Sequence, residues 1–254
     1  MNAYKCIILN FCLISNILSA TDLVVGTTSA YAPFVSLDET GQYVGFDVDI
    51  ANEVAKKLGR TLMIKDLGSM PSLIMALKQN KIDLLIWAVS ITEARQKQME
   101  MIYYQGEEFK SLPLLFWKQI PPTITSLESF AKDPKSVISV EAGSCQESFL
   151  LTVAGLNIKQ VDKVMDAIFE LKYGKSLATI VDNSLLKSIT EKFPEIKVMN
   201  VPLPQSEQVF GNGICVNKQN QLLIEQVRQV VDDLRRDGKI AELELKWNLK
   251  GANL

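Results

Sequence analysis

Apolar and polar residues alternate along this chain in two patterns, one with the length of β-strands and one with the period of an α-helix. Short apolar runs that predict buried strands are Leu23–Gly26, Leu84–Val89 and Leu112–Trp117. The clearest amphipathic stripe predicts a helix over Asp47–Leu58, with Gly59 just past its end, where helices commonly stop. A longer stripe predicts another helix over Gln221–Arg236. This mixture indicates an α/β protein.

The remaining periodic segments are shorter. They predict further strands at Tyr43–Phe46, Met63–Lys65, Val137–Val140, Leu177–Val181 and Ile196–Val201. They predict further helices at Ser72–Gln79, Gln146–Val153, Val164–Lys172 and Lys239–Trp247, and one that begins near Ser184. The sequence shows no internal repeat, low-complexity segment or metal-ligand spacing.

The segment after the strand Leu84–Val89 carries the first candidate chemistry. Ser90 follows the strand, Thr92 suits the N-cap of the next helix, and Arg95 lies about one turn into it. Ligands of open α/β sheets bind beyond the carboxyl ends of the strands. A hydroxyl and a guanidinium that converge there suit a small carboxylate. Taken alone, the pair is equally compatible with a surface arginine and a strand-end serine.

Composition narrows the class of protein. The 254 residues are 47% hydrophobic and 22% charged, as in ordinary globular proteins, and the net charge of −2 does not favour nucleic acid or an anionic membrane. The chain has no histidine. This excludes histidine-dependent triads and the commonest general base, and it lowers the expectation of an enzyme. We expect neither a metal nor a cofactor.

The N-terminus, Met1–Ala20, has the pattern of a cleaved secretory signal peptide. Lys5 supplies positive charge, Cys6–Leu18 is largely apolar, and Ser19 and Ala20 are small. The segment is too short for a membrane-spanning helix. We therefore expect a soluble exported protein that starts near residue 21, with the cleavage site left open.

Two cysteines, Cys145 and Cys215, lie outside this signal segment. An oxidising compartment would allow them to pair. Their predicted strand and helix contexts are far apart, so we expect free thiols. Cys145 lacks a histidine base, and thiol catalysis is therefore not expected.

Several motifs, in order, resemble one protein family. They are Tyr31–Phe34, Gly45–Ile50 with its following apolar stripe, Leu73–Lys78, and Ser90–Arg95. Together they resemble the bacterial extracellular solute-binding proteins of family 3, which are the periplasmic polar amino-acid receptors of ABC importers. The resemblance covers essentially the whole chain after the signal. Several motifs at family spacing are far more specific than any one of them.

The resemblance implies a periplasmic-binding-protein type 2 fold, with two α/β lobes joined by two hinge strands like a Venus flytrap. Lobe 1 would comprise residues 21–112 and 209–254, and lobe 2, residues 113–208, would be inserted in it. The two crossings are expected at Leu112–Trp117 and Gly211–Val216.

The resemblance also implies how the ligand's α-carboxylate is bound. Ser90 and Arg95 would hold it from one lobe. From the other lobe, the backbone amides of Ser144 and Cys145 would bind it, since Gly143 allows close approach and a helix N-terminus attracts anions.

The ligand's α-ammonium would meet two acceptors, the carboxylate of Asp182 and the backbone carbonyl of Ala88. An N-cap role explains Asp182 equally well from the sequence.

The ligand's side chain would lie against Tyr31 and Met70, where the family usually has an aromatic residue at the position of Met70. Trp87 is either core or part of this wall. Glu141 matches a family position that faces the ligand side chain, and a carboxylate there suggests arginine first, then lysine or ornithine. Thr28 argues against this, because it replaces an acid found in some receptors for basic amino acids.

We therefore expect a monomeric periplasmic receptor, not an enzyme, that delivers a free L-amino acid to an inner-membrane ABC permease. The alternatives are a receptor for a neutral polar amino acid such as glutamine, a secreted dehydratase of the prephenate or arogenate type on the same fold, and a sensory ectodomain. The sequence does not specify which amino acid is bound, with what affinity, or which permease is the partner. It also does not specify whether the protein stays in the periplasm or reaches the cell surface.

Overall fold

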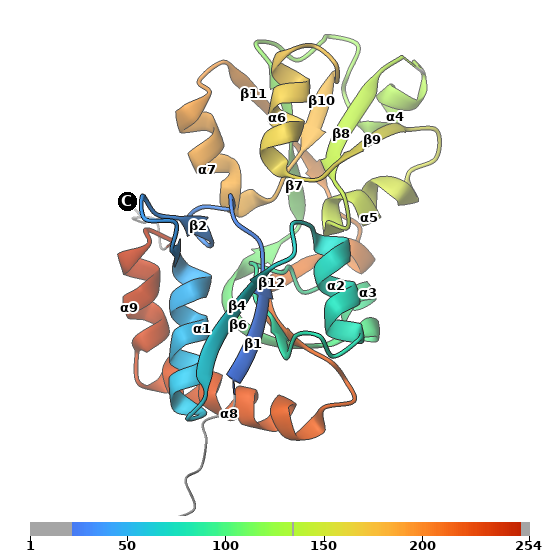
Figure 1. Ribbon diagram of the computed structural model, residues 1–254. Coiled ribbons are helices and arrows are strands. Elements are labelled where there is room, and N and C mark those ends of the chain that lie inside the picture. The colour runs from blue at the N-terminus through green and yellow to red at the C-terminus, as the bar shows by residue number, and fades with distance from the viewer. Residues whose placement is uncertain (1–21, 134, 250–254) are drawn as a thin grey trace, which may run out of the picture.

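The computed structural model describes residues 22–133 and 135–249. The signal-peptide prediction for Met1–Ala20 lies outside these residues. Two five-stranded sheets form the centres of two lobes, which lie one above the other in Figure 1. Within the described ranges, no helix is long and apolar enough to cross a membrane.

Lobe 1 is built on the sheet with strand order β4-β1-β5-β12-β6. Its strands are β1 (Asp22–Thr27), β4 (Thr61–Asp66), β5 (Leu84–Leu85), β6 (Glu100–Phe109) and β12 (Val209–Val216), and a small hairpin adds β2 (Ser36–Leu37) and β3 (Tyr43–Val44). Its helices are α1 (Phe46–Lys57), α2 (Met70–Lys78), α3 (Glu93–Gln98), α8 (Gln221–Arg236) and α9 (Lys239–Lys246). β1 pairs in parallel with β4 and β5, whereas β12 runs antiparallel to β5 and β6.

Lobe 2 is built on the sheet with strand order β11-β7-β10-β8-β9. Its strands are β7 (Ser111–Trp117), β8 (Val137–Glu141), β9 (Asn157–Val161), β10 (Ala178–Ile180) and β11 (Ile196–Pro202). Its helices are α4 (Leu127–Ala131), α5 (Cys145–Thr152), α6 (Val164–Lys172) and α7 (Asn183–Lys192), and a 3-10 turn, η1 (Gln205–Glu207), precedes β12.

The amphipathic helices bury the faces that their sequence patterns indicate. In α1 the buried stripe includes Ile50, Ala51 and Val54, and in α8 it includes Val227 and Val231. These side chains join the single large core cluster of lobe 1, while lobe 2 has two smaller clusters on the two faces of its sheet. The predicted bounds of α6 and α8 agree with the structure. The two-lobed α/β fold expected from the sequence is therefore present.

The chain crosses between the lobes at Lys110 and again through residues 203–208, and the Leu203 amide donates to the Lys110 carbonyl at 2.8 Å. These crossings lie a few residues away from those expected. Leu112–Trp117 belongs wholly to the sheet of lobe 2, because it pairs along its length with β11. Gly211–Val216 belongs to the sheet of lobe 1, because it pairs with β6.

The expected strand Leu84–Val89 was the least accurate element. Only Leu84 and Leu85 pair as strand β5, and the chain then leaves the sheet through Ala88, whose φ of 43° is left-handed. Three strands and one α-helix were not predicted, namely β2, β6, β9 and α4, nor was the 3-10 turn η1. The outer strand β9 is largely polar and exposed, so it has no apolar run to reveal it.

Candidate functional site

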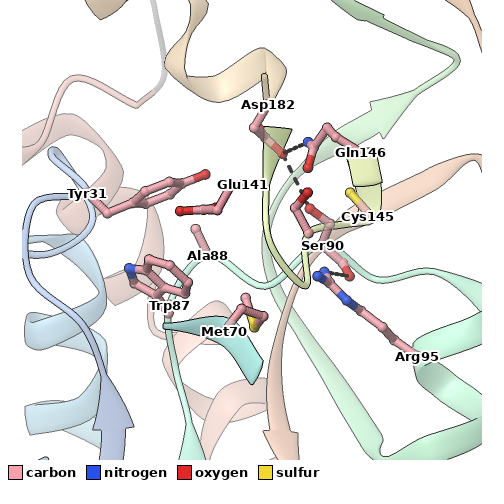
Figure 2. Close-up of a pocket in the computed structure, with 11 residues that line it drawn as sticks. Tyr31, Met70, Trp87, Ala88, Ser90, Arg95, Glu141, Cys145, Gln146 and Asp182 are labelled. Carbon is pink, nitrogen blue, oxygen red and sulfur yellow. Dashed lines mark hydrogen bonds between the residues drawn. The ribbon is translucent and has the colours of Figure 1, made fainter. Parts of the chain in front are cut away.

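A small cavity of about 20 Å³ lies between the two lobes (Figure 2). Every residue predicted to bind the ligand lines it: Tyr31, Met70, Ala88, Ser90, Arg95, Glu141, Ser144, Cys145 and Asp182. Trp87 and Gln146 complete the lining. Residues far apart in the sequence thus share one site, although their roles in binding stay predictions.

Lobe 1 contributes the cation of the site. Thr92 caps α3, and its hydroxyl accepts a hydrogen bond from the Arg95 amide at 3.3 Å. The Arg95 side chain is 8% exposed, and its guanidinium donates to the Ser90 carbonyl at 3.0 Å. The other terminal nitrogen crosses to lobe 2 and donates to the Gly143 carbonyl at 2.9 Å. Arg95 is therefore fixed by neutral acceptors, and none of the carboxylates in the described part of the chain forms a direct ion pair with it.

Opposite Arg95, lobe 2 presents the start of helix α5. Ser144 is the N-cap, and its hydroxyl accepts from the Glu147 amide at 3.0 Å. The Ser144 amide itself donates to the Glu141 carbonyl at 3.3 Å, so this amide already has a partner within the loop. Cys145 begins the helix, and first-turn amides have no partner inside a helix. The Cys145 amide is the stronger candidate of the two for an anion.

Asp182 is the N-cap of α7 and also lines the cavity, while its role in ligand binding stays a prediction. One carboxylate oxygen accepts from the amide and hydroxyl of Ser184 and so caps α7. The other oxygen points to the cavity and accepts from the Ser90 hydroxyl and the Gln146 amide, each at 3.3 Å. The capping contact therefore orients the second oxygen toward the cavity, so an N-cap role and a ligand-binding role are compatible for the same carboxylate.

Glu141 ends strand β8 and its carboxyl group points toward Tyr31 (Figure 2). Burial raises the pKa of Glu141 to about 8, an effect that Arg95 opposes and Asp182 reinforces. Near pH 7 this carboxyl group is therefore largely protonated. A cationic group placed beside it would favour the ionised form and release the proton.

Aromatic side chains form the wall beside Glu141. The rings of Tyr31 and Trp87 have centroids 5.2 Å apart and are inclined at 54°. Tyr31 packs against the core of lobe 1 and also against one core cluster of lobe 2. Met70, at the start of α2, is 5% exposed and lies at the edge of the same wall.

Gly143 of lobe 2 lies in close contact with the start of α2 in lobe 1. Its φ is 74°, and an added Cβ would stand 3.0 Å from Pro71 and 3.2 Å from Met70. Together with the Arg95–Gly143 and Ser90–Asp182 hydrogen bonds, this contact joins the two sides of the cleft. The cavity between them has room for about one or two water molecules, which is too little for a molecule as large as an amino acid.

The two described cysteines, Cys145 and Cys215, lack the features of a catalytic thiol. Cys145 and Cys215 are free and buried, and burial raises the pKa of both thiols. A raised pKa disfavours the thiolate, which is the nucleophilic form. Across residues 22–133 and 135–249, no group of three His, Cys, Asp or Glu side chains is arranged to hold a metal ion.

Of the two further lining residues, the sequence left Trp87 open between core and wall and did not indicate Gln146. Trp87 lies where the chain leaves the sheet after β5. In the strand predicted over Leu84–Val89, its side chain could equally face the core or the ligand. Gln146 lies one position beyond the predicted amides of α5, and its side chain reaches Asp182. Its place next to a predicted anion-binding turn was the available signal.

Comparison with known proteins agrees with this architecture. The family model of the bacterial extracellular solute-binding proteins, family 3, matches residues 23–250. A probable ABC transporter arginine-binding protein, ArtJ, from Chlamydia trachomatis serovar D is 33% identical over 97% of this chain and 95% of its own length.

Two solved structures are also similar. An ancestral arginine-binding protein bound to arginine is 30% identical, with a TM-score of 0.76 over 89% of this chain and 97% of its own. An ancestral arginine-binding protein bound to glutamine is 31% identical, with a TM-score of 0.73 over the same shares. The chain belongs to the bacterial extracellular solute-binding proteins, family 3.

Proposed function

We propose that this protein is the receptor of an ABC importer for a free L-amino acid, with arginine as the preferred ligand. The observation that carries the proposal is the arrangement of opposite charges in one cleft, with Arg95 on lobe 1 and Asp182 on lobe 2. An amino acid has both a carboxylate and an ammonium, and it can bridge these two charges. The inference about arginine rests in addition on Glu141 and on the names of similar proteins.

The carboxylate of the ligand would bind Arg95, the Ser90 hydroxyl and the Cys145 amide, replacing the contact between Arg95 and Gly143. The ammonium would bind Asp182 and the Ala88 carbonyl. A charge-assisted hydrogen bond contributes about 1.5–3 kcal/mol, whereas a micromolar complex needs about 8 kcal/mol in all. The difference offsets desolvation and lost freedom of motion.

The side chain of arginine would extend along Tyr31, Met70 and Trp87 toward Glu141. A guanidinium stacks well on aromatic faces and pairs with a carboxylate, and both groups are available there. Because these groups come from both lobes, the ligand would favour the closed state over the open one.

A neutral ligand such as glutamine is the second candidate. The raised pKa of Glu141 favours a neutral carboxyl group near pH 7, which can donate to an amide oxygen. The similarity to an ancestral protein bound to glutamine agrees with this alternative.

Other parts of the proposal follow from this role. Met1–Ala20 would direct export to the periplasm, the mature protein would act as a monomer without catalysis, and the partner would be an inner-membrane permease. The lobes would divide near residues 112 and 208, with 209–254 returning to lobe 1. A dehydratase would need a proton donor in the cleft, and Glu141 would have to supply it without help from histidine.

A thermal-shift screen tests the function directly. The mature protein, refolded after denaturation to remove retained ligand, is heated with each of the twenty amino acids and with ornithine. A ligand that binds only the native state raises the melting temperature by mass action. We expect the largest shift with arginine. A shift confined to glutamine would keep the receptor role and reject the arginine preference, and the absence of any shift would reject the receptor role, to be followed by a turnover assay on prephenate and arogenate.

A further inference from the structure

Asp47 is a charged residue buried inside lobe 1, away from the lining of the cavity. It lies in the first turn of α1 and is 1% exposed. It does not cap its own helix, because the N-cap position is Gly45 and no side chain caps there. Its carboxylate instead bonds residues 41 and 57 positions away in the sequence.

One oxygen of Asp47 accepts a hydrogen bond from the Ala88 amide at 2.6 Å. The other oxygen accepts from the Tyr104 hydroxyl, also at 2.6 Å. Tyr104 is 1% exposed and stacks on Phe46 with ring centroids 5.9 Å apart. The carboxylate is therefore held rigidly from one side and holds Ala88 from the other.

Ala88 needs such a partner because its backbone is strained. Its φ of 43° is left-handed, a conformation that L-residues other than glycine seldom adopt and that costs about 1–2 kcal/mol. The neighbouring backbone is tied to the sheet, since Ile86 donates to Gly26 and Val89 accepts from Gly213. Between them the chain turns toward the cavity, and Ala88 lines it.

We propose that Asp47 is a positioning residue for ligand binding, which fixes the left-handed Ala88 so that its carbonyl meets the α-ammonium of the ligand. This inference rests on the proposed function of the cleft as an amino-acid site. Asp47 itself does not touch the ligand.

The chemistry of the buried carboxyl group agrees with a positional role. Burial raises the pKa of Asp47 to about 7, against the hydrogen bonds from Tyr104 and Ala88, which lower it. Either protonation state leaves an oxygen that accepts from the Ala88 amide. An asparagine keeps such an oxygen, whereas an alanine removes it.

The test compares arginine with 5-guanidinopentanoic acid, the same molecule without the α-amino group, by calorimetry. We expect Asp47→Ala to weaken arginine binding about 10- to 100-fold, the range for one charge-assisted hydrogen bond, and to change binding of the analogue less than about threefold. Asp47→Asn should keep arginine binding within about threefold of wild type. A purely structural role would weaken both ligands alike.

Asp49→Asn is the matched control. Asp49 lies in the same first turn but accepts from Lys246 at 2.7 Å and from the Trp247 indole at 2.6 Å, far from the cavity lining. We expect its substitution to leave both affinities unchanged.

A second variant keeps the inference testable if Asp47→Ala does not fold. Tyr104→Phe removes one of the two hydrogen bonds that the Asp47 carboxylate accepts. It should weaken arginine binding about threefold or more and leave binding of the analogue unchanged. Hydrogen exchange at the Ala88 amide is a ligand-independent readout, and it should be fast in Asp47→Ala or Tyr104→Phe relative to wild type.

The outcomes separate the inference from the proposed function. Equal losses for both ligands, or an Ala88 amide that exchanges as slowly in the variants as in wild type, overturn the role of Asp47 alone. If the wild-type protein prefers another amino acid, the calorimetric test uses that amino acid and its analogue without the α-amino group in place of arginine and 5-guanidinopentanoic acid. A wild-type protein that binds no amino acid overturns both.

Discussion

The two sides of the cleft differ in the groups they bring. Lobe 1 contributes the cation Arg95, the hydroxyl of Ser90 and the rings of Tyr31 and Trp87. Lobe 2 contributes two carboxyl groups, Glu141 and Asp182, and the start of helix α5. The formally charged partners are thus divided, with the cation on lobe 1 and both carboxyl groups on lobe 2. In the proposed function, an amino acid would pair with full charges of both signs only when it contacts both lobes.

The two sides also differ in how their polar groups are held. In lobe 1, Arg95 lies in the first turn of α3, and its guanidinium is fixed by backbone carbonyls. In lobe 2, Ser144 and Asp182 are themselves the N-caps of α5 and α7. A substitution in lobe 2 therefore disturbs a helix as well as the site, whereas a substitution of Arg95 disturbs mainly the site.

The largest expected effect tests this difference. Arg95→Met should weaken binding of every amino acid about 100-fold or more, because it removes the partner of the shared α-carboxylate. The melting temperature of the ligand-free protein should change little. Asp182→Ala should weaken binding similarly and also destabilise the protein by about 1 kcal/mol, the usual value of an N-cap.

Calorimetry and ligand-free denaturation measure the two effects separately. Asp182→Asn is the matched control, since asparagine is also a good N-cap and should restore stability without restoring affinity. Equal destabilisation by Arg95→Met and Asp182→Ala would contradict the comparison between the lobes.

Glu141 is the group of lobe 2 that we expect to distinguish ligands by their side chains. Glu141→Gln should weaken arginine about 10-fold or more and glutamine less than about threefold, because only arginine gains a charge-assisted bond there. Competition binding with both ligands measures the ratio. Equal effects on both amino acids would contradict the role of Glu141.

The pKa of Glu141 adds a pH dependence to this prediction. The ligand-free carboxyl group has a pKa of about 8, and a bound guanidinium lowers it, so binding releases a proton below pH 8. Arginine affinity should therefore rise between about pH 6 and 8, by at most about tenfold per pH unit, and then level off. The charged or titratable groups facing Glu141 include Arg95, Asp182 and Tyr31. Glutamine, and arginine with Glu141→Gln, should show no such slope.

The smallest effect concerns the contact between the lobes. Gly143→Ala places a Cβ 3.0 Å from Pro71 in the closed arrangement of this structure, whose cavity is too small for an amino acid. The variant should therefore disfavour this ligand-free closed state, and we expect arginine affinity to rise by about twofold. The φ of 74° strains alanine in open and closed states alike, which should lower stability by about 1 kcal/mol. Gly174→Ala is the control, since Gly174 has a φ of 67° but no atom within 4 Å of an added Cβ. It should lower stability without changing affinity.

Several features of this protein could be predicted because their signals are local. The helices α6 and α8 carry complete amphipathic stripes, and Thr92 caps α3 as its position before Glu93 indicates. The motifs around Tyr31, Ser90 and Arg95 indicated the family, and with it the residues that line the cavity. Helix periods, caps and short motifs are read within a few residues, so no long-range contact is needed to find them.

Other features depend on contacts between distant residues, and only the tertiary structure decided them. Strand β5 ends after Leu85, and the Ala88 amide bonds the carboxylate of Asp47, which lies 41 positions earlier. The direct contact of Arg95 with Gly143 depends on how the lobes meet. The sequence by itself determined most of the helices and strands and the chemical groups that line the cleft. Packing decided which of those groups are held, strained or paired, because the free energy of each buried polar group depends on the partner that folding places beside it.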